Sequence, residues 1–398
     1  MSKQTLLMIS IELPYPANSG GRVKSWNMLK YLTDHFTVSL ACPLKYGRKH
    51  LSAFAQSVEL EAFFHEKVEE PRSPKNLVKS YLKGTPLNVL RSGSKKLKER
   101  IRGIANDYDI ILIDHYEAAQ YIPSNFKGKV VFHAHNATYL MWDRYAKEGN
   151  NFFMRAIANC EAKRVAKFES QICIRSDLFF ASPNDIENLS KIGANSSISR
   201  ETFHLGDDSQ LALPSIKFEE TEKRLLYIGT LSWEANVDGL IWFLDFIWPD
   251  IKANNPSLIL DIAGGNPAQR LVEKVAQNKD IHLLGFVDDL EPLFKRSRVF
   301  VAPLTYGSGI KVKVLNSMCR GLPISTTSVG AEGIDANHLT HLCIDDTASD
   351  MVCSIDRLLH DQALWQTIEQ KSRALVREKY TWDRVLGYMV SEINQITT

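Results

Sequence analysis

Short apolar runs alternate with longer mixed segments along the whole chain. Each run is long enough for one buried strand, and the mixed segment after it has room for a helix. The runs predicted as strands are 6–10, 38–42, 110–113, 130–132, 177–181, 225–228 and the run that begins at Val299. Helices are expected at 20–32 and about 157–175. This alternation is typical of α/β domains with parallel sheets, and 177–181 is expected to be the last strand of the first half.

A stretch without hydrophobic periodicity divides the chain. Residues 206–222 include Gly206, two aspartates and Pro214, and we expect the interdomain linker there. A chain of 398 residues is also too long for one ordinary core. The pattern therefore predicts a first domain over residues 1–208 and a second over residues 222–381.

Composition and charge narrow the class of protein. A hydrophobic content of 44% supports real cores, and a net charge of +2 predicts no general attraction to nucleic acid. Polar residues appear too early in the first ten positions for the apolar segment of a signal peptide. No apolar run approaches the ~20 residues of a membrane span. The six cysteines are scattered without a Cys-x-x-Cys pair, which favours reduced thiols in the cytoplasm and no zinc site.

A glycine loop between a buried run and a helix carries the strongest chemical signal. Gly307 and Gly309 let backbone N–H groups approach a ligand, and the following helix brings partial positive charge together with Lys311 and Lys313. These features suit a phosphate. An ordinary β-α-β crossover with its lysines in water explains the same local pattern equally well.

Two further segments lie where parallel strands end. Gly20 and Gly21 follow the first strand and precede a helix, so they suit close approach to a diphosphate or sugar, or form a plain turn. His135 and Asn136 follow the strand at 130–132, on the edge where open α/β sheets bind ligands. We expect a functional histidine there rather than one satisfied by a neighbouring loop.

The segment Pro303-Leu-Thr-Tyr-Gly-Ser-Gly-Ile-Lys-Val-Lys-Val-Leu-Asn-Ser-Met318 resembles the donor-site motif of family 4 glycosyltransferases of the GT-B fold. Other segments that match follow in the family's order: Tyr227–Trp233, Asp238–Phe243, Leu260–Gly265, Leu284–Asp289 and Tyr380–Trp382. The resemblance is strong over residues 222–385 and weaker over 5–190. It implies two Rossmann-like domains facing across a cleft, with a C-terminal helix, residues 382–398, that crosses back to the first domain.

The resemblance also implies an activity. Such an enzyme is a retaining, metal-independent glycosyltransferase of the hexosyltransferase type that uses a nucleotide-diphosphate sugar. Its acceptor would be a glycan or a lipid-linked glycan in the synthesis of a bacterial surface polysaccharide such as lipopolysaccharide. No cofactor is expected, because the nucleotide sugar is a substrate.

Site roles follow from the matching positions. Lys311 and Lys313 would neutralise the diphosphate, and His135 would contact the sugar near the reacting carbon. The residues expected to bind substrate are Gly20, Gly21, Arg22, Asn136, Gly229, Gly264, Phe286, Val287, Gly307, Ser308, Gly309, Ile310 and Asn316.

The chain departs from the family's pattern at two positions. Tyr306 and Asn316 stand where the family usually has glutamate, and the usual Arg/Lys pair is absent from 229–236. Asn316 still has an acceptor and a donor for the ribose hydroxyls, without a carboxylate's charge-assisted strength. Two alternatives therefore stay open, a non-catalytic nucleotide-sugar binder or assembly partner, and a sugar-nucleotide epimerase of the same fold.

A strongly basic stretch lies in the first half. Residues 71–102 hold ten lysines and arginines against one acid, Glu99, with apolar residues between them. Basic residues 72–102 form either a solvated helical face or a contact with an anionic membrane surface, and we favour the membrane contact. That contact would place the protein peripherally at the inner face of the cytoplasmic membrane. Nucleic acid is the poorer partner, because no binding module for it is recognisable.

Overall fold

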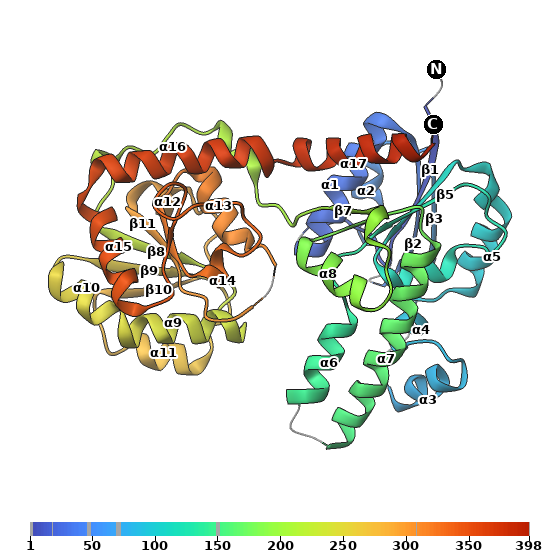
Figure 1. Cartoon of the computed structure of the whole chain (residues 1–398), viewed down its shortest axis with the longest axis horizontal. Coiled ribbons are helices and arrows are strands. Elements are labelled where there is room, and N and C mark those ends of the chain that lie inside the picture. The colour runs from blue at the N-terminus through green and yellow to red at the C-terminus, as the bar shows by residue number, and fades with distance from the viewer. Residues whose placement is uncertain are drawn as a thin grey trace. The chain divides into compact units, whose positions relative to one another are not determined.

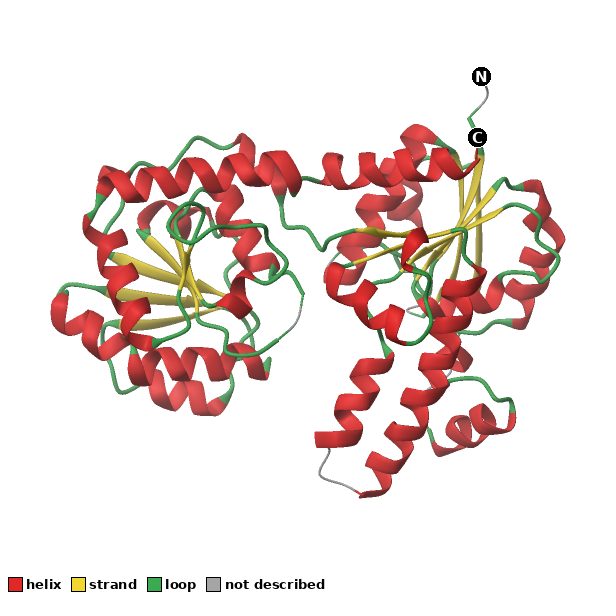
Figure 2. Cartoon of the chain, viewed as in Figure 1, coloured by secondary structure: helices red, strands yellow, loops and turns green. Residues whose placement is uncertain are grey.

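The computed structural model describes residues 3–17, 19–45, 49–68, 73–148, 152–307 and 309–397. The chain forms two compact units, residues 1–203 with 385–398, and residues 204–384. Each unit is a parallel sheet with helices on both faces (Figures 1 and 2). The expected α/β class with parallel sheets is therefore confirmed.

Unit 1 contains a seven-stranded sheet in the order β3-β2-β1-β4-β5-β6-β7. Its central strands are almost wholly apolar because helices cover them on both sides. The strands are β1 (Thr5–Ile9), β2 (Thr37–Leu44), β3 (Ala62–Lys67), β4 (Ile110–Asp114), β5 (Lys129–His133), β6 (Leu178–Ala181) and β7 (Ser199–Glu201). The helices are α1 (Gly20–His35), α2 (Leu51–Ser57), α3 (Pro74–Leu82), α4 (Leu87–Arg91), α5 (Lys95–Ile104), α6 (Tyr139–Glu148), α7 (Phe152–Arg175) and α8 (Pro183–Lys191).

Unit 2 contains a six-stranded sheet in the order β10-β9-β8-β11-β12-β13. The strands are β8 (Arg224–Ile228), β9 (Ile259–Ala263), β10 (Ile281–Gly285), β11 (Val299–Ala302), β12 (Ile324–Thr326) and β13 (Cys343–Ile344). The helices are α9 (Glu234–Phe246), α10 (Trp248–Asn254), α11 (Gln269–Val275), α12 (Glu291–Arg296), α13 (Val312–Arg320), α14 (Ser328–Ala331), α15 (Ala348–His360) and α16 (Gln362–Lys379). None of the helices in the described ranges is long and apolar enough to cross a membrane.

The final helix, α17 (Trp382–Thr397), returns to unit 1, as expected. Near its end, Thr397 Oγ1 donates to Gln4 Oε1 at 3.0 Å, and Glu392 pairs with Arg200 of β7. Tyr380, just before this helix, and Trp382, its first residue, belong to unit 2. There, Tyr380 Oη accepts from the backbone of Asp335 at 2.8 Å, and Trp382 donates to the carbonyl of Gly206 at 3.0 Å.

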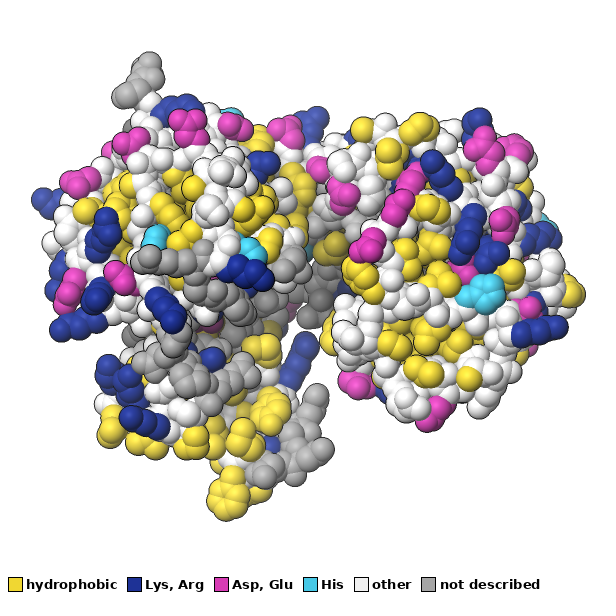
Figure 3. Space-filling view, turned by 180° about the vertical axis from the view of Figure 1, so that it is seen from behind, with side chains coloured by type: hydrophobic (Ala, Val, Ile, Leu, Met, Phe, Trp, Pro, Cys, Tyr) yellow, Lys and Arg dark blue, Asp and Glu magenta, His cyan; other side chains and the backbone are white. Residues whose placement is uncertain are grey.

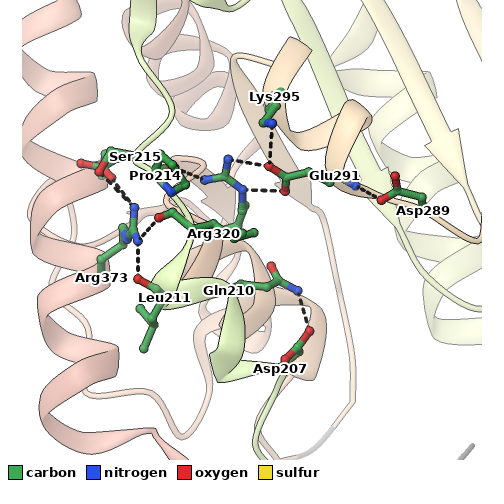
Figure 4. A network of polar contacts seen from close by, with 12 residues as sticks. Asp207, Gln210, Leu211, Pro214, Ser215, Asp289, Glu291, Lys295, Arg320 and Arg373 are labelled. Atoms are coloured by element: carbon green, nitrogen blue, oxygen red, sulfur yellow. Dashed lines mark hydrogen bonds and ion pairs between the residues drawn. The ribbon is translucent and has the colours of Figure 1, made fainter.

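Two expectations about the middle of the chain need correction. The last strand of unit 1 is β7, not the run at 177–181, and β7 was missed because Ser-Arg-Glu carries no apolar signal. Residues 206–222 are not a free linker, because unit 2 holds them (Figure 4). Arg373 donates to the carbonyls of Leu211 and Leu213 at 2.7 and 2.8 Å, and the buried Arg320 donates to Pro214 O at 3.0 Å. The chain passes from unit 1 to unit 2 at residues 203–204.

Candidate active site

In unit 2, the strand order reverses between β8 and β11. Ligands of open parallel sheets bind beyond the carboxyl ends of the strands at such a switch point. The loops that leave these two strands begin at Gly229 and Pro303. The predicted glycine loop therefore lies at the position in the sheet that favours a ligand.

The loop after β11 needs glycine at two places. Gly307 and Gly309 have φ angles of 144° and 73°, which L side chains rarely adopt. Lys311 caps the following helix, α13, whose first backbone N–H groups have no partner within the helix. Ile310 is partly buried, and Ser308, which was also predicted to bind substrate, lies outside the described residues. The loop thus combines an exposed helix start with a backbone free of side chains at two positions.

The two predicted lysines differ in how their charge is balanced. Lys311 is buried and bonds the carboxylate of Glu332 at 3.2 Å and the carbonyl of Gly309. Lys313 instead donates to two neutral oxygens, Tyr227 Oη at 2.8 Å and Asn236 Oδ1 at 2.5 Å. Its ammonium also lies 4.6 Å from the centre of the Tyr227 ring. Within the described residues, no carboxylate pairs with Lys313.

The electrostatics follow from these contacts. Burial, with a smaller contribution from the charge of Lys311, lowers the pKa of Lys313 from 10.5 to about 7. Burial also lowers the pKa of Lys311, but Glu332 opposes that shift. When it is protonated, Lys313 carries a charge that no carboxylate among the described residues balances, and an anion bound beside it would raise its pKa.

Two predicted glycines explain how the Lys313 partners fit together. A Cβ on Gly229 would lie 2.9 Å from Tyr227 Oη and 3.1 Å from Asn236 Nδ2. A Cβ on Gly264 would lie 1.9 Å from the carbonyl oxygen of Gly229. Both glycines thus permit close backbone packing under Lys313, whatever else they contact.

The other predicted residues of unit 2 are Phe286, Val287 and Asn316, and Lys313 is not among their hydrogen-bond partners. Phe286 is 76% exposed, so it does not belong to the core, and its neighbour Val287 is partly buried. Asn316 accepts a hydrogen bond from the backbone of Asp207 at 2.8 Å through Oδ1. A ribose hydroxyl would share that oxygen with the 206–222 segment.

In unit 1, the strand order reverses between β1 and β4, and several polar groups meet there. Asp114 ends β4, and both of its carboxylate oxygens are used. Oδ1 accepts from His133 Nδ1 at 2.8 Å and from His135 Nε2 at 2.7 Å. Oδ2 accepts from the hydroxyls of Ser10 and Ser25 at 3.1 and 2.6 Å. The structure thus links Asp114 to the predicted histidine.

This network fixes the charge states of its members. Burial opposes ionisation of Asp114, but His135, His115 and the hydrogen bonds from His133 and His135 hold its pKa well below the usual range. Burial lowers the pKa of both His133 and His135 to about 4. Neutral imidazoles each carry one N–H, and His135 gives that N–H to Asp114. Its Nδ1 is then a hydrogen-bond acceptor.

His135 is also held by a second histidine. The ring of His115 stacks on it with 3.5 Å between centroids and 9° between planes. His115 has a φ of 73°, a strained conformation for a residue other than glycine. A Cβ on Gly21 would lie 3.8 Å from His135 Nδ1 and 4.0 Å from the His115 ring, so the start of α1 reaches these rings. Gly20 has open space where its Cβ would be.

The remaining predicted residues of unit 1, Arg22 and Asn136, are not among the groups that bond Asp114. Arg22 pairs with Glu12 at 2.8 Å, so its charge is already balanced, and Asn136 is exposed beside the histidine. Asp114, His115 and His135 offer ligand atoms within 4.8 Å of one another, close enough to hold a metal ion. A metal would displace two N–H donors from Asp114, and the charge of the buried Lys24 acts on the same carboxylate. These residues fit a hydrogen-bonded network better than a metal centre.

The sequence pattern indicates His135, Lys311 and Lys313 as site residues but not the contacts that bond them. Asp114, Tyr227 and Asn236 lie on other elements, between 21 and 86 residues away in sequence. Asp114 directly follows the predicted strand 110–113, and Tyr227 lies near the end of the predicted strand 225–228. Polar residues at neighbouring strand ends of a parallel sheet come together.

A family model and several known proteins are similar to this chain. Residues 222–361 match the family described as Glycosyl transferases group 1. An uncharacterized 44.6 kDa protein in the cps region of Klebsiella pneumoniae is 24% identical over 372 residues, covering 85% of this chain and 87% of that protein. An uncharacterized glycosyltransferase of Methanocaldococcus jannaschii is 27% identical over 179 residues, 43% of this chain and 44% of the relative.

Among solved structures, Anabaena HepE in complex with UDP is similar in fold. It superposes with a TM-score of 0.68 at 13% sequence identity, over 98% of this chain and 100% of HepE. The predicted GT-B architecture is confirmed by this similarity.

Proposed function

We propose a donor and a mechanism for this chain, which is a glycosyltransferase of the GT-B fold with a group 1 domain at residues 222–361. The chain transfers a sugar from a nucleotide-diphosphate sugar to a glycan or lipid-linked acceptor, with retention of anomeric configuration and without a metal ion. The setting is the synthesis of a bacterial surface polysaccharide. The basic residues 72–102 contact an anionic membrane surface.

Lys313 is the observation that carries the proposal. A mostly buried ammonium with only neutral oxygens around it is costly unless an anion completes the site. The adjacent glycine loop and the start of α13 supply N–H donors for such an anion. A diphosphate matches both features, because its charge is high and its oxygens accept several hydrogen bonds. As the glycosidic bond breaks, negative charge grows on the leaving diphosphate, and Lys313 stabilises it.

The cluster in unit 1 is assigned to the sugar. His135 gives its Nε2–H to Asp114, so Nδ1 accepts a hydrogen bond from a sugar hydroxyl. His115 and Gly21 keep that ring in place. A neutral histidine suits a retaining transfer, in which the leaving phosphate itself takes the proton of the acceptor. The protein then supplies position and charge rather than a pair of catalytic carboxylates.

A panel of UDP-, GDP- and ADP-sugars tests the function. The purified protein is incubated with each donor and with saccharide or lipid-linked acceptors, and the products are followed by NMR. We expect one donor to be consumed only when an acceptor is present, and the product to keep the donor's anomeric configuration. Activity that needs an added divalent metal, or an inverted product, contradicts the mechanism. Conversion of a donor without acceptor identifies an epimerase instead.

A further inference from the structure

A helical hairpin of unit 1 presents an unusual surface. Helices α6 and α7 pack along each other, and Arg164 of α7 fastens α3 beside them. Its guanidinium donates to the carbonyls of Ser80 and Thr85 at 2.6 and 2.5 Å and lies 4.3 Å from the ring of Tyr81. We call residues 73–83, 139–148 and 152–164 the hairpin surface, because these segments form one lobe (Figure 1).

Large apolar side chains on this surface are open to solvent. Leu82 is 84% exposed, and Phe152 and Phe153, which lie side by side at the start of α7, are 78% and 76% exposed. The other exposed apolar residues of the same segments are Val78, Tyr81, Met141, Tyr145 and Met154. Scattered apolar residues are normal on a protein surface, but a group of this size marks a contact site.

The same surface is basic. Its segments contain eight lysines and arginines against three acids. Two of the acids are already paired, Asp143 with Lys147 at 2.6 Å and Glu161 with Arg164. Yellow hydrophobic and dark blue basic side chains lie next to each other on the lower lobe of Figure 3.

The structure also separates the basic stretch 72–102 into two surfaces. In α5, Leu97 and Ile101 are buried in the core, so this helix shows mainly charged side chains to solvent. In α3, Val78 and Leu82 are exposed together with lysines. Arg72 lies outside the described residues. Apolar insertion and basic contact are therefore combined on α3 and the hairpin, and not on α5.

We propose that the hairpin surface docks on a lipid bilayer with anionic headgroups. Phe152, Phe153 and Leu82 enter the boundary between headgroups and acyl chains, while the lysines and Arg155 contact lipid phosphates. A bilayer explains the composition better than a protein partner does, since protein interfaces are depleted in lysine whereas lysine and aromatic residues together favour the membrane interface. This inference rests on the proposed membrane contact of residues 72–102 and narrows it, because the hairpin takes part in the docking and α5 does not.

Vesicle co-sedimentation tests the docking surface. We expect the protein to bind vesicles of equal parts phosphatidylcholine and phosphatidylglycerol and to stay in solution with phosphatidylcholine alone. The double variant Phe152→Ala with Phe153→Ala should weaken binding at least about tenfold. The double variant Lys75→Gln with Lys83→Gln should weaken it about 25-fold, since each basic residue near an anionic surface contributes roughly fivefold.

Matched variants separate this surface from the rest of the molecule. Phe246→Ala removes another exposed phenylalanine, from unit 2 (62% exposed), and Lys95→Gln with Lys98→Gln removes two exposed lysines from α5. Both should change vesicle binding less than about twofold. Circular dichroism and the affinity for nucleoside diphosphate should be unaltered in every variant. A docking defect is thereby distinguished from misfolding or from failure of the donor site.

Three outcomes overturn the inference. The first is that the wild-type protein binds neither kind of vesicle. The second is that the α5 lysine variant loses vesicle binding while the phenylalanine variant keeps it. The third is that the phenylalanine variant changes the sedimentation coefficient of the protein without vesicles, which would show that a second copy covers the surface. None of these results touches the transferase proposal, which the donor panel tests separately.

Discussion

The pKa of Lys313 makes donor binding depend on pH. In the free protein this ammonium titrates at about 7, whereas beside a bound diphosphate it stays protonated to much higher pH. Binding a nucleoside diphosphate above pH 7 therefore requires uptake of a proton. The affinity should be highest near pH 7 and should fall about tenfold for each pH unit well above it. Below about pH 6 it should fall again, because the terminal phosphate gains a proton.

The magnitude follows from this single titration. Between pH 7 and pH 9, the fraction of free protein with protonated Lys313 falls from about one half to about one hundredth, so the dissociation constant should rise about 50-fold. At pH 8 the complex should take up about 0.9 proton. Folding stability is a poorer readout of Lys313, because burial lowers the pKa of Lys24 in unit 1 to about 7 as well.

Calorimetry in buffers of different ionisation enthalpy measures both the affinity and the proton uptake. Lys313→Arg keeps its charge at every pH and should bind with a nearly flat profile, while Lys313→Ala should bind weakly with a flat profile and turn over about 100-fold more slowly. Lys279→Ala, which removes an exposed lysine of unit 2, is the control. The free nucleoside should bind equally well at all pH values.

Two results would refute this reasoning. One is a wild-type dissociation constant that changes less than about twofold from pH 7 to pH 9. The other is a pH dependence that persists unchanged in Lys313→Ala, because the titrating group would then lie elsewhere. Either result would return Lys313 to the role of a partly buried helix residue.

Three more predictions test the surrounding structure. Asp114→Asn should let His135 change its tautomer, which imidazole ¹⁵N shifts would show, and should lower turnover about 100-fold or more. Ser25→Ala removes one neutral donor to Asp114 and should lower turnover less than about tenfold. Gly264→Ala should destabilise unit 2 by about 2 kcal/mol or more in urea unfolding, whereas Gly20→Ala should stay within about 0.5 kcal/mol. Arg373→Met should speed proteolysis within 206–222 about tenfold or more, since two carbonyls lose their donor; unchanged cleavage would contradict the anchoring.

The hydrophobic pattern predicted β1, β2, β4, β5, β6, β8 and β11, which are interior strands of their sheets, and did not predict the edge strands β3 and β7. The central strands of both sheets read as apolar runs because helices cover them on each side. β3 ends in His-Glu-Lys, and β7 consists of Ser-Arg-Glu. Both lie at sheet edges, where each strand pairs with one neighbour and has less apolar burial. Edge strands of this kind leave no periodic signal.

The candidate site shows the same limit in another form. The glycine loop and its lysines are local in sequence, so their pattern could be recognised. The contacts that define their chemistry are not local, because Lys313 meets Tyr227 and Asn236 from β8 and α9, and His135 meets Asp114 from β4. Only the fold brings these groups together, and with them the shifted pKa values.

The two positions that depart from the family's pattern are each used inside unit 2. Tyr306 donates to Asp238 at 2.6 Å, and Asp238 also pairs with Arg270 at 2.6 Å, so a glutamate at position 306 would face a carboxylate. Asn316 bonds the backbone of the anchored 206–222 segment.

Neither residue supplies charge to a ligand. The positive charge left for a diphosphate comes from the start of α13, from Lys311, which Glu332 already balances in part, and from Lys313. Of the two lysines, Lys313 alone lacks a carboxylate partner within the described residues, so the loss of both glutamates concentrates the anion site on this one side chain.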